Sequence, residues 1–316
     1  MTSLKLDSLT ARELSDRLQG GGIYLKVPPF VVHVKSPIPV VTEGLLSMYA
    51  EHELLSDEDQ FADFHVSVVY GRRFPRRLCV FEMDGFAPFT PLAAHEAFAF
   101  FEWGLNWCVT GYCHTLITIH SAVLERNGRA LIMPAPPGSG KSTLCAALLL
   151  AGWRLLSDEM ALLDPKTGLV WPSPRPVSLK NKSIDIIKQR APYGVFGPVA
   201  RDTMKGTVAH MRVPSASLSR AHDACLPGWV VFPKYIVDAP AQLVARGKAK
   251  SLMQLAENSF NQSVQGRAGF EALARLIDDC DCYDFSYGHI DEALEIFSKL
   301  PLPDSAPAAT TATAAA

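Results

Sequence analysis

The segment with the clearest chemical signature lies between positions 135 and 142, where the chain reads APPGSGKS. It has the spacing of a phosphate-binding loop, with Ala135 in place of the usual first glycine. Gly138 and Gly140 allow the backbone to approach phosphate oxygens closely, and Lys141 adds a compact positive charge. The segment therefore predicts a nucleotide site made of six residues: Gly138, Ser139, Gly140, Lys141, Ser142 and Thr143.

The flanking residues support this interpretation. Residues 116–124 and 130–133 are apolar runs typical of strands, joined by a turn at Asn127 and Gly128, and residues 142–150 are good helix formers. A helix that begins near Lys141 directs unpaired N–H groups toward phosphate, and the Ser142 hydroxyl is placed to bind Mg²⁺. A glycine turn that merely caps a helix is the alternative, which the strand, loop and helix order disfavours.

Two adjacent carboxylates, Asp158 and Glu159, follow a strand-like run at residues 153–156. We expect that strand to deliver them to the carboxyl end of an α/β sheet, where ligands bind. One carboxylate would hold Mg²⁺ while the other orients or deprotonates a hydroxyl that attacks the γ-phosphate. A solvated pair at a strand end is the alternative.

His120 lies in the strand that precedes the hairpin, on the same face as Thr118 and Ala122. On its own, a single strand histidine is typical of a packed or hydrogen-bonded structural residue.

Composition and charge indicate the kind of protein that carries these residues. The 316 residues are 48% hydrophobic, and 30 Lys and Arg against 32 Asp and Glu give a formal charge of −2. Such a balance favours a globular fold and gives no basic field for nucleic acid. We expect an α+β domain at residues 1–112, a P-loop domain at 113–300 and a disordered tail at 301–316. A basic turn, residues 72–77, is expected within the first domain.

Seven cysteines without metal-site spacing, and no secretory leader, predict free thiols in a cytoplasmic protein. The most apolar stretch, residues 98–112, is interrupted by Glu102 and Asn106 and is shorter than a bilayer requires. It predicts a buried helix and no membrane partner.

Between residues 115 and 164 the chain resembles the catalytic domain of the HPr kinase/phosphorylase family. The shared features are a strand histidine (His120), a loop ending in GKS, and the run GWRLLSDE at residues 152–159. The chain is more similar still to HPr-kinase-related kinases, through the phrases FEWGLNW at 101–107, RPVSLKN at 175–181 and KGTVAH at 205–210.

The resemblance implies a P-loop kinase fold of the phosphoenolpyruvate-carboxykinase-like type that uses ATP and Mg²⁺. It also implies Asp158 as the base at the acceptor hydroxyl, His120 in support, Mg²⁺ held by Ser142 and Glu159, and possible homo-oligomers. Two departures, Glu159 for Asp and Thr143 for Glu, put HPr itself in doubt as the acceptor.

We therefore expect an ATP-dependent kinase that phosphorylates a hydroxyl, most simply serine, on a peptide or small protein. A nucleotide-gated ATPase scaffold and a small-molecule kinase are the alternatives. Four further cationic side chains are candidates for contacts to phosphate or acceptor, or for purely structural roles: Arg175, Lys180, Lys205 and His210.

Overall fold

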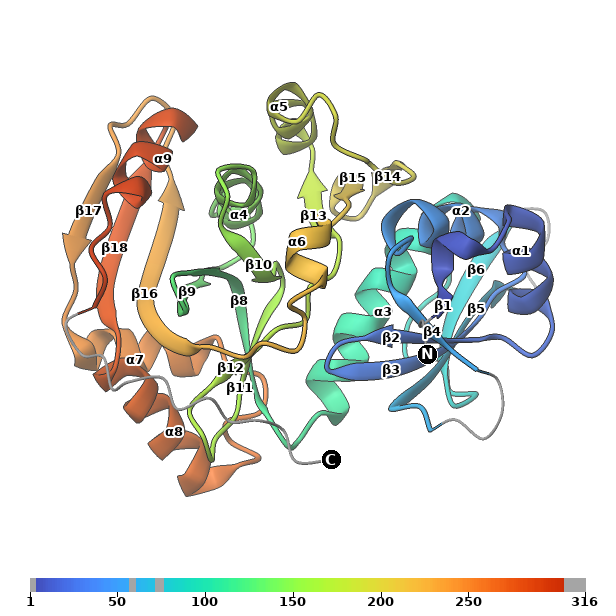
Figure 1. Cartoon of the computed structure of the whole chain (residues 1–316), viewed down its shortest axis with the longest axis horizontal. Helices are drawn as coiled ribbons and strands as arrows, with labels where there is room; N and C mark the ends of the chain where they lie inside the picture. Colours follow the sequence, from blue (N-terminus) through green and yellow to red (C-terminus); the bar gives the residue numbers. More distant parts are fainter. Residues whose placement is uncertain (1–3, 57–60, 72–76, 304–316) are drawn as a thin grey trace.

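The computed structural model describes residues 4–56, 61–71 and 77–303 of the chain. In Figure 1, an N-terminal sheet with its helices lies to one side, and a larger sheet lies to the other. The larger part carries the predicted phosphate-binding loop, residues 135–142, which is called the phosphate loop below. Most of the expected basic turn and of the expected disordered tail falls outside the described residues. The whole is a mixed α/β arrangement, as expected.

The N-terminal unit is a seven-stranded sheet in the order β1-β4-β2-β3-β5-β6-β7. Its helix α1 starts with a capping box between Thr10 and Glu13. The strands of this unit are β1 (Leu4–Lys5), β2 (Ile23–Val27), β3 (Phe30–Lys35), β4 (Glu53–Leu55), β5 (Phe64–Tyr70), β6 (Leu78–Met83) and β7 (Leu92–Ala93). Its helices are α1 (Ala11–Gln19), α2 (Pro39–Met48) and α3 (Ala97–Tyr112), with short 3₁₀ turns at Leu6–Ser8 and Ala94–Glu96.

The rest of the described chain contains an eight-stranded and a three-stranded sheet. The larger sheet comprises β8 (Ile117–Arg126), β9 (Arg129–Pro134), β10 (Arg154–Ser157), β11 (Met160–Leu163), β12 (Val170–Trp171), β16 (Leu226–Tyr235), β17 (Gln242–Ala245) and β18 (Asp281–Tyr287). The smaller one comprises β13 (Val177–Lys180), β14 (Ala200–Thr203) and β15 (Gly206–Met211). The helices are α4 (Lys141–Leu150), α5 (Lys182–Arg190), α6 (Ser215–Leu218), α7 (Lys248–Glu257), α8 (Gly266–Asp278) and α9 (Ile290–Ser298).

The β8–β9 hairpin leads directly into the phosphate loop. Its turn has the two positive φ angles of a tight hairpin, 54° at Asn127 and 77° at Gly128, as the sequence predicts. From β9 the chain passes through the loop into α4, and in its middle the sheet is parallel, with β9 beside β16 and β16 beside β18.

The strand that carries the two carboxylates is arranged differently from a parallel α/β strand. Both β10 and β11 pair antiparallel with β8. Asp158 and Glu159 thus lie between two successive strands that both run antiparallel to β8, although they do follow the carboxyl end of β10, as expected. The sheet is mixed because three strands, β9, β10 and β11, are all antiparallel to β8.

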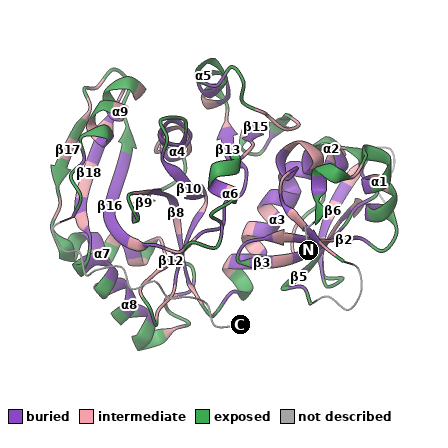
Figure 2. Ribbon diagram, in the orientation of Figure 1, coloured by how far each residue is buried: buried purple, intermediate pink, exposed green. Residues whose placement is uncertain are grey.

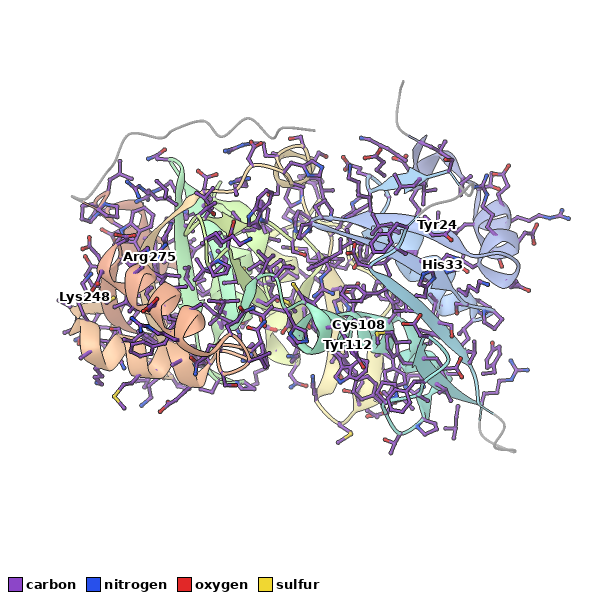
Figure 3. All side chains as sticks on the ribbon, turned by 90° about the horizontal axis from the view of Figure 1, so that it is seen from below. Tyr24, His33, Cys108, Tyr112, Lys248 and Arg275 are labelled. Carbon is purple, nitrogen blue, oxygen red and sulfur yellow. The ribbon has the colours of Figure 1, made fainter. Side chains whose placement is uncertain are left out.

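Helix α3 lies between the two parts of the molecule (Figure 1). It is the buried helix predicted at residues 98–112, and even its Glu102 is buried. Figure 2 shows buried residues running through the central strands and α4, with exposed residues on the outer helices. In Figure 3, Cys108 and Tyr112 of α3 lie between Tyr24 and His33 of the N-terminal sheet and Lys248 and Arg275 of α7 and α8.

All seven cysteines are free and buried. Among the described residues, no helix is both long enough and apolar enough to cross a bilayer.

Candidate functional site

The phosphate loop depends on its glycines. Gly138 and Gly140 both have φ near 85°, a conformation that L side chains rarely adopt. A Cβ on Gly140 would also lie 2.5 Å from the Tyr287 hydroxyl and 2.8 Å from Cβ of Tyr235. The same tyrosines hold the loop, because Tyr287 Oη donates to Gly140 O at 2.9 Å and Tyr235 N donates to Ser139 O at 2.9 Å.

Lys141, the first residue of α4, carries a buried ammonium group. The side chain is 7% exposed, and its Nζ has no hydrogen-bond partner. Burial lowers the pKa of Lys141, and the carboxylates of Glu159 and Asp158 oppose that shift. The Ser139 hydroxyl is likewise buried without a partner. Buried groups of this kind are costly unless a ligand satisfies them, so the loop is chemically suited to an anion.

A cavity of about 1080 Å³ opens in front of the loop. Eight of the nine residues predicted from the sequence line it: His120, Gly138, Ser139, Gly140, Lys141, Ser142, Thr143 and Glu159. Its other walls come from α5, the β14–β15 turn and the first turn of α9. The volume is at the upper end of the range usual for ligand pockets, about 300–1,000 Å³.

The ninth predicted residue, Asp158, does not line this cavity. It is 3% exposed and lies against a neighbouring enclosed space of about 10 Å³, the size of one water molecule. Its Oδ2 accepts a hydrogen bond from Ser178 N at 3.0 Å, and its Oδ1 has no partner. Ser178 and Glu159 line both spaces, so they separate Asp158 from the large cavity.

The two carboxylates have opposite electrostatic character. Burial and the neighbouring Glu159 raise the pKa of Asp158 to about 6. Burial pushes the pKa of Glu159 upward as well, but Lys180 and Lys141 outweigh it and hold that pKa below its usual value. One carboxyl of the pair thus titrates near neutral pH while the other stays charged.

His120 belongs to β8 and faces the large cavity. Its backbone N donates to Asn258 O at 2.8 Å, and its ring lies 6.0 Å from that of Phe260. Burial and the nearby Lys141 lower the pKa of His120 to about 4. The imidazole is therefore neutral at pH 7 and suited to hydrogen bonding rather than to carrying charge.

Two of the four further cationic candidates face away from the large cavity. Arg175 Nη1 lies 3.6 Å from Glu102 Oε2 in a buried ion pair, and its Nη2 donates to Asn106 Oδ1. Glu102 Oε1 in turn accepts from Tyr49 Oη at 2.7 Å. His210 is fully buried against Phe98, and burial lowers its pKa to about 4. Arg175 and His210 line the small space beside Asp158. Glu102, Trp103 and Asn106 line it too, so α3 contributes directly to the surroundings of the acidic pair.

The other two candidates, Lys180 and Lys205, do line the large cavity. Lys180 ends β13, and Lys205 lies in the β14–β15 turn with Nζ 4.6 Å from the ring centroid of Trp103. They bring positive charge to the wall that faces the phosphate loop.

The residues around the loop are compatible with Mg²⁺, although the described part of the chain has no group of three His, Cys, Asp or Glu side chains that could hold a metal ion on its own. Mg²⁺ usually keeps several waters and takes one or two protein oxygens together with substrate phosphates. Ser142 and Glu159 border the same cavity and could supply two such oxygens.

Several residues of the site escaped sequence reasoning. Ser178, Tyr235 and Tyr287 come from strands of the unassigned region after residue 170, and Glu102 looked like an interruption in an apolar helix. Two signals were available for Glu102: it lies in the phrase FEWGLNW, and a carboxylate within a buried helix requires a partner.

No protein-family model matches this chain, and no curated protein sequence matches it.

Proposed function

We propose that the protein is an ATP-dependent kinase that transfers the γ-phosphate to a hydroxyl, most simply serine, of a peptide or small protein. The observation that carries the proposal is the buried, unpartnered Lys141 ammonium, which borders the same cavity as Glu159 at the N-terminus of α4. A phosphate-binding loop beside a pair of carboxylates with separated pKa values is the arrangement that phosphoryl transfer needs.

The residues of the loop would bind the nucleotide phosphates. Lys141 and the backbone N–H groups at the start of α4 would contact the terminal phosphates, and Ser142 and Glu159 would hold Mg²⁺. When bound, Mg²⁺ neutralises charge on the phosphates. The lowered pKa of Glu159 suits a ligand that must remain ionised.

Asp158 would accept the proton of the attacking hydroxyl. Its pKa of about 6 makes it an effective base near neutral pH. An acceptor hydroxyl that reaches Asp158 would have to enter between Ser178 and Glu159, which border both spaces. The neutral His120 would support that hydroxyl through hydrogen bonding.

The resemblance to HPr-kinase-related kinases supports the same proposal and extends it to a P-loop fold of the phosphoenolpyruvate-carboxykinase-like type. We also propose that the protein is cytoplasmic, that it self-associates, and that it has neither nucleic-acid nor membrane partners.

The test is mass spectrometry of candidate acceptor peptides and small proteins after incubation with ATP and Mg²⁺, with Asp158→Asn as the control. An added phosphate that depends on Asp158 supports the kinase. ADP release without any phosphorylated product favours an ATPase scaffold instead, and a phosphorylated metabolite in a small-molecule screen favours the third alternative.

A further inference from the structure

The wall that faces the phosphate loop is built from β13 and the start of α5. Side chains alternate along β13, so Val177 and Leu179 enter the core while Ser178 and Lys180 point to the other face. Both Ser178 and Lys180 line the large cavity. This wall is separate from the segment that forms the phosphate loop.

The Ser178 hydroxyl has an unsatisfied hydrogen-bonding capacity. The residue is 4% exposed, and its Oγ has no hydrogen-bond partner. An orphaned buried hydroxyl is destabilising, and native structures retain such groups chiefly where a ligand or water completes them. Ser178 Oγ thus indicates a polar ligand at this wall.

Helix α5 begins immediately after Lys180 and presents its N-terminus to the same cavity. Its N-cap, Asn181, makes no side-chain cap; instead Asn181 Oδ1 accepts from Thr207 N at 3.0 Å. The first residues of this nine-residue helix, Lys182 and Ser183, line the cavity. The unpaired N–H groups and dipole of such a helix start favour an anion.

Asn181 is also held in an unfavourable conformation. Its φ of 52° and ψ of −127° lie outside the left-handed helical region that asparagine tolerates. The adjoining turn is fitted to it, since a Cβ on Gly206 would lie 2.2 Å from Asn181 Oδ1. Backbone strain that surrounding contacts maintain is typical of ligand sites.

Among the described residues, positive charge converges on this wall without a carboxylate in contact, and Glu159 acts on Lys180 and Lys205 from beyond ion-pair distance. Across the described ranges, no carboxylate lies within 4 Å of the ammonium groups of Lys180, Lys182 or Lys205. The ammonium group of Lys205 lies over the ring of Trp103. Partial burial and the nearby Lys180 lower the pKa of Lys205. Like charges kept together in this way are stabilised when an anion binds between them.

We infer that Ser178, Lys180, Lys205 and the first turn of α5 form a second anion subsite, which binds a carboxylate or phosphate group that the acceptor carries beside its reactive hydroxyl. This inference rests on the proposed kinase function and names the acceptor class as anionic. Because Ser178 borders the space that holds Asp158, an anion bound here would bring the neighbouring hydroxyl toward the acidic pair.

The test uses the full chain loaded with Mg²⁺ and adenylyl imidodiphosphate, a non-hydrolysable ATP analogue, and titrated with inorganic phosphate in a calorimeter. Phosphate is expected to bind the loaded protein, and Lys180→Gln and Lys205→Gln are each expected to weaken it by roughly ten-fold or more while nucleotide affinity changes little. Lys188→Gln is the matched control, because Lys188 lies on α5 but does not line the cavity.

Retained nucleotide binding shows that each variant is folded. Phosphate binding that is absent, or equal in the wild type and both variants, overturns the inference. Loss of nucleotide affinity in the two variants also overturns it, because the lysines would then serve the nucleotide itself.

If the wild type binds no nucleotide, the proposed function fails. The second anion subsite is then tested by titrating the unloaded protein with phosphate. Phosphate binding that needs Lys205 and persists in Lys141→Gln would still support a second anion site, whereas its absence would exclude one.

A second comparison separates the two sources of negative charge. A serine peptide flanked by glutamates is titrated beside the same peptide flanked by glutamines, and both are compared with the same peptide flanked by phosphothreonines. Preference for the glutamate peptide identifies a carboxylate-bearing acceptor, and preference for the phosphothreonine peptide identifies a phosphate-bearing one. Equal affinity of the charged and neutral ligands contradicts the inference.

Discussion

The two sides of the candidate site are built in different ways. The phosphate-loop side is one continuous segment, from β9 through the glycine loop into α4. The carboxylate side is assembled from separate segments, with Asp158 and Glu159 after β10, Ser178 on β13, His210 on β15 and Glu102 on α3. The first side leaves its Lys141 ammonium without a partner, whereas on the second side the Glu102 and Arg175 charges are paired with each other.

This difference indicates a division of labour. An unpartnered buried charge is costly and is explained by an absent ligand, so the loop side is organised for binding. On the carboxylate side the Glu102 and Arg175 pair fixes geometry, whereas Asp158 Oδ1 and Ser178 Oγ have no partner among the described residues, so this side combines positioning with capacity for the acceptor. The predictions below test that division.

The largest expected effect is on the carboxylate side. Asp158→Asn should lower phosphoryl transfer by roughly 10²–10⁴-fold and leave nucleotide affinity intact, because it removes the base and not the loop. In the wild type, kcat should rise with pH until about 6 and then level off, since Asp158 must lose its proton to act. Kinetics across pH 5 to 8 provide the measurement.

Glu159→Gln is the control for that experiment. As a proposed Mg²⁺ ligand, it should shift the Mg²⁺ requirement. It should also move the pH step below 6 without abolishing it, because Glu159 helps to raise the pKa of Asp158. Full transfer by Asp158→Asn would contradict the base assignment.

On the loop side, Lys141→Met should separate function from stability. Nucleotide turnover should fall by roughly 10²–10³-fold, because a charge-stabilising contact to phosphate is lost. The free energy of unfolding of the ligand-free protein should rise by about 1 kcal/mol or more, since an unsatisfied buried ammonium is removed. Urea unfolding measures the second effect, and Lys188→Met, an exposed change on α5, is its control. A lower unfolding free energy would show that Lys141 has a structural role.

The ion pair between α3 and the site should respond in the opposite direction. Arg175→Met leaves the Glu102 carboxylate buried without its cation, although Tyr49 Oη still donates to it, so the change should lower the unfolding free energy by about 3–5 kcal/mol. Adding Glu102→Gln should restore much of that loss, because no buried charge then remains. A double variant no more stable than the single one would mean that the pair is not the source of the effect.

These contrasts also explain which parts of the site could be predicted from the sequence. The loop could be predicted because Gly138, Gly140 and Lys141 are neighbours, and local spacing specifies local geometry. The strand-like run before Asp158 and Glu159 predicted their position at a strand end. The antiparallel pairing of β10 with β8 could not be predicted, since pairing depends on distant segments.

Long-range packing decided the remaining residues. Nothing near Arg175 in the sequence distinguishes a partner of Glu102 from a phosphate contact, whereas Lys205 does face the cavity. Ser178 lies in the phrase RPVSLKN, but nothing in that phrase marked it as part of the site, because its importance comes from a missing hydrogen bond and not from its residue type.

The two loop glycines allow a more local comparison. Gly138→Ala and Gly140→Ala share the cost of a positive φ, about 1–2 kcal/mol. Gly140→Ala should lose roughly 1–3 kcal/mol more, because its Cβ would overlap Tyr287 and Tyr235, while a Cβ on Gly138 meets nothing within 4 Å. Paired urea denaturation curves measure the difference, and equal losses would show that the tyrosines do not constrain the loop.

The smallest effect is expected at the outer rim, where Arg190 of α5 and Asp291 of α9 form a two-pronged ion pair at 2.7 and 2.8 Å. The Asp291 side chain is 80% exposed, so solvent screens the pair despite its good geometry, and Arg190→Gln should cost less than about 1 kcal/mol. Arg190 lowers the pKa of Asp291, so the contribution is present above the ordinary pKa of an aspartate and disappears as pH falls through the lowered value. A double-mutant cycle with Asp291→Asn at low and high salt measures the coupling. A coupling well above 1 kcal/mol that survives high salt would mean that this exposed link, and not the buried packing of β13 and α5, holds the wall of the cavity in place.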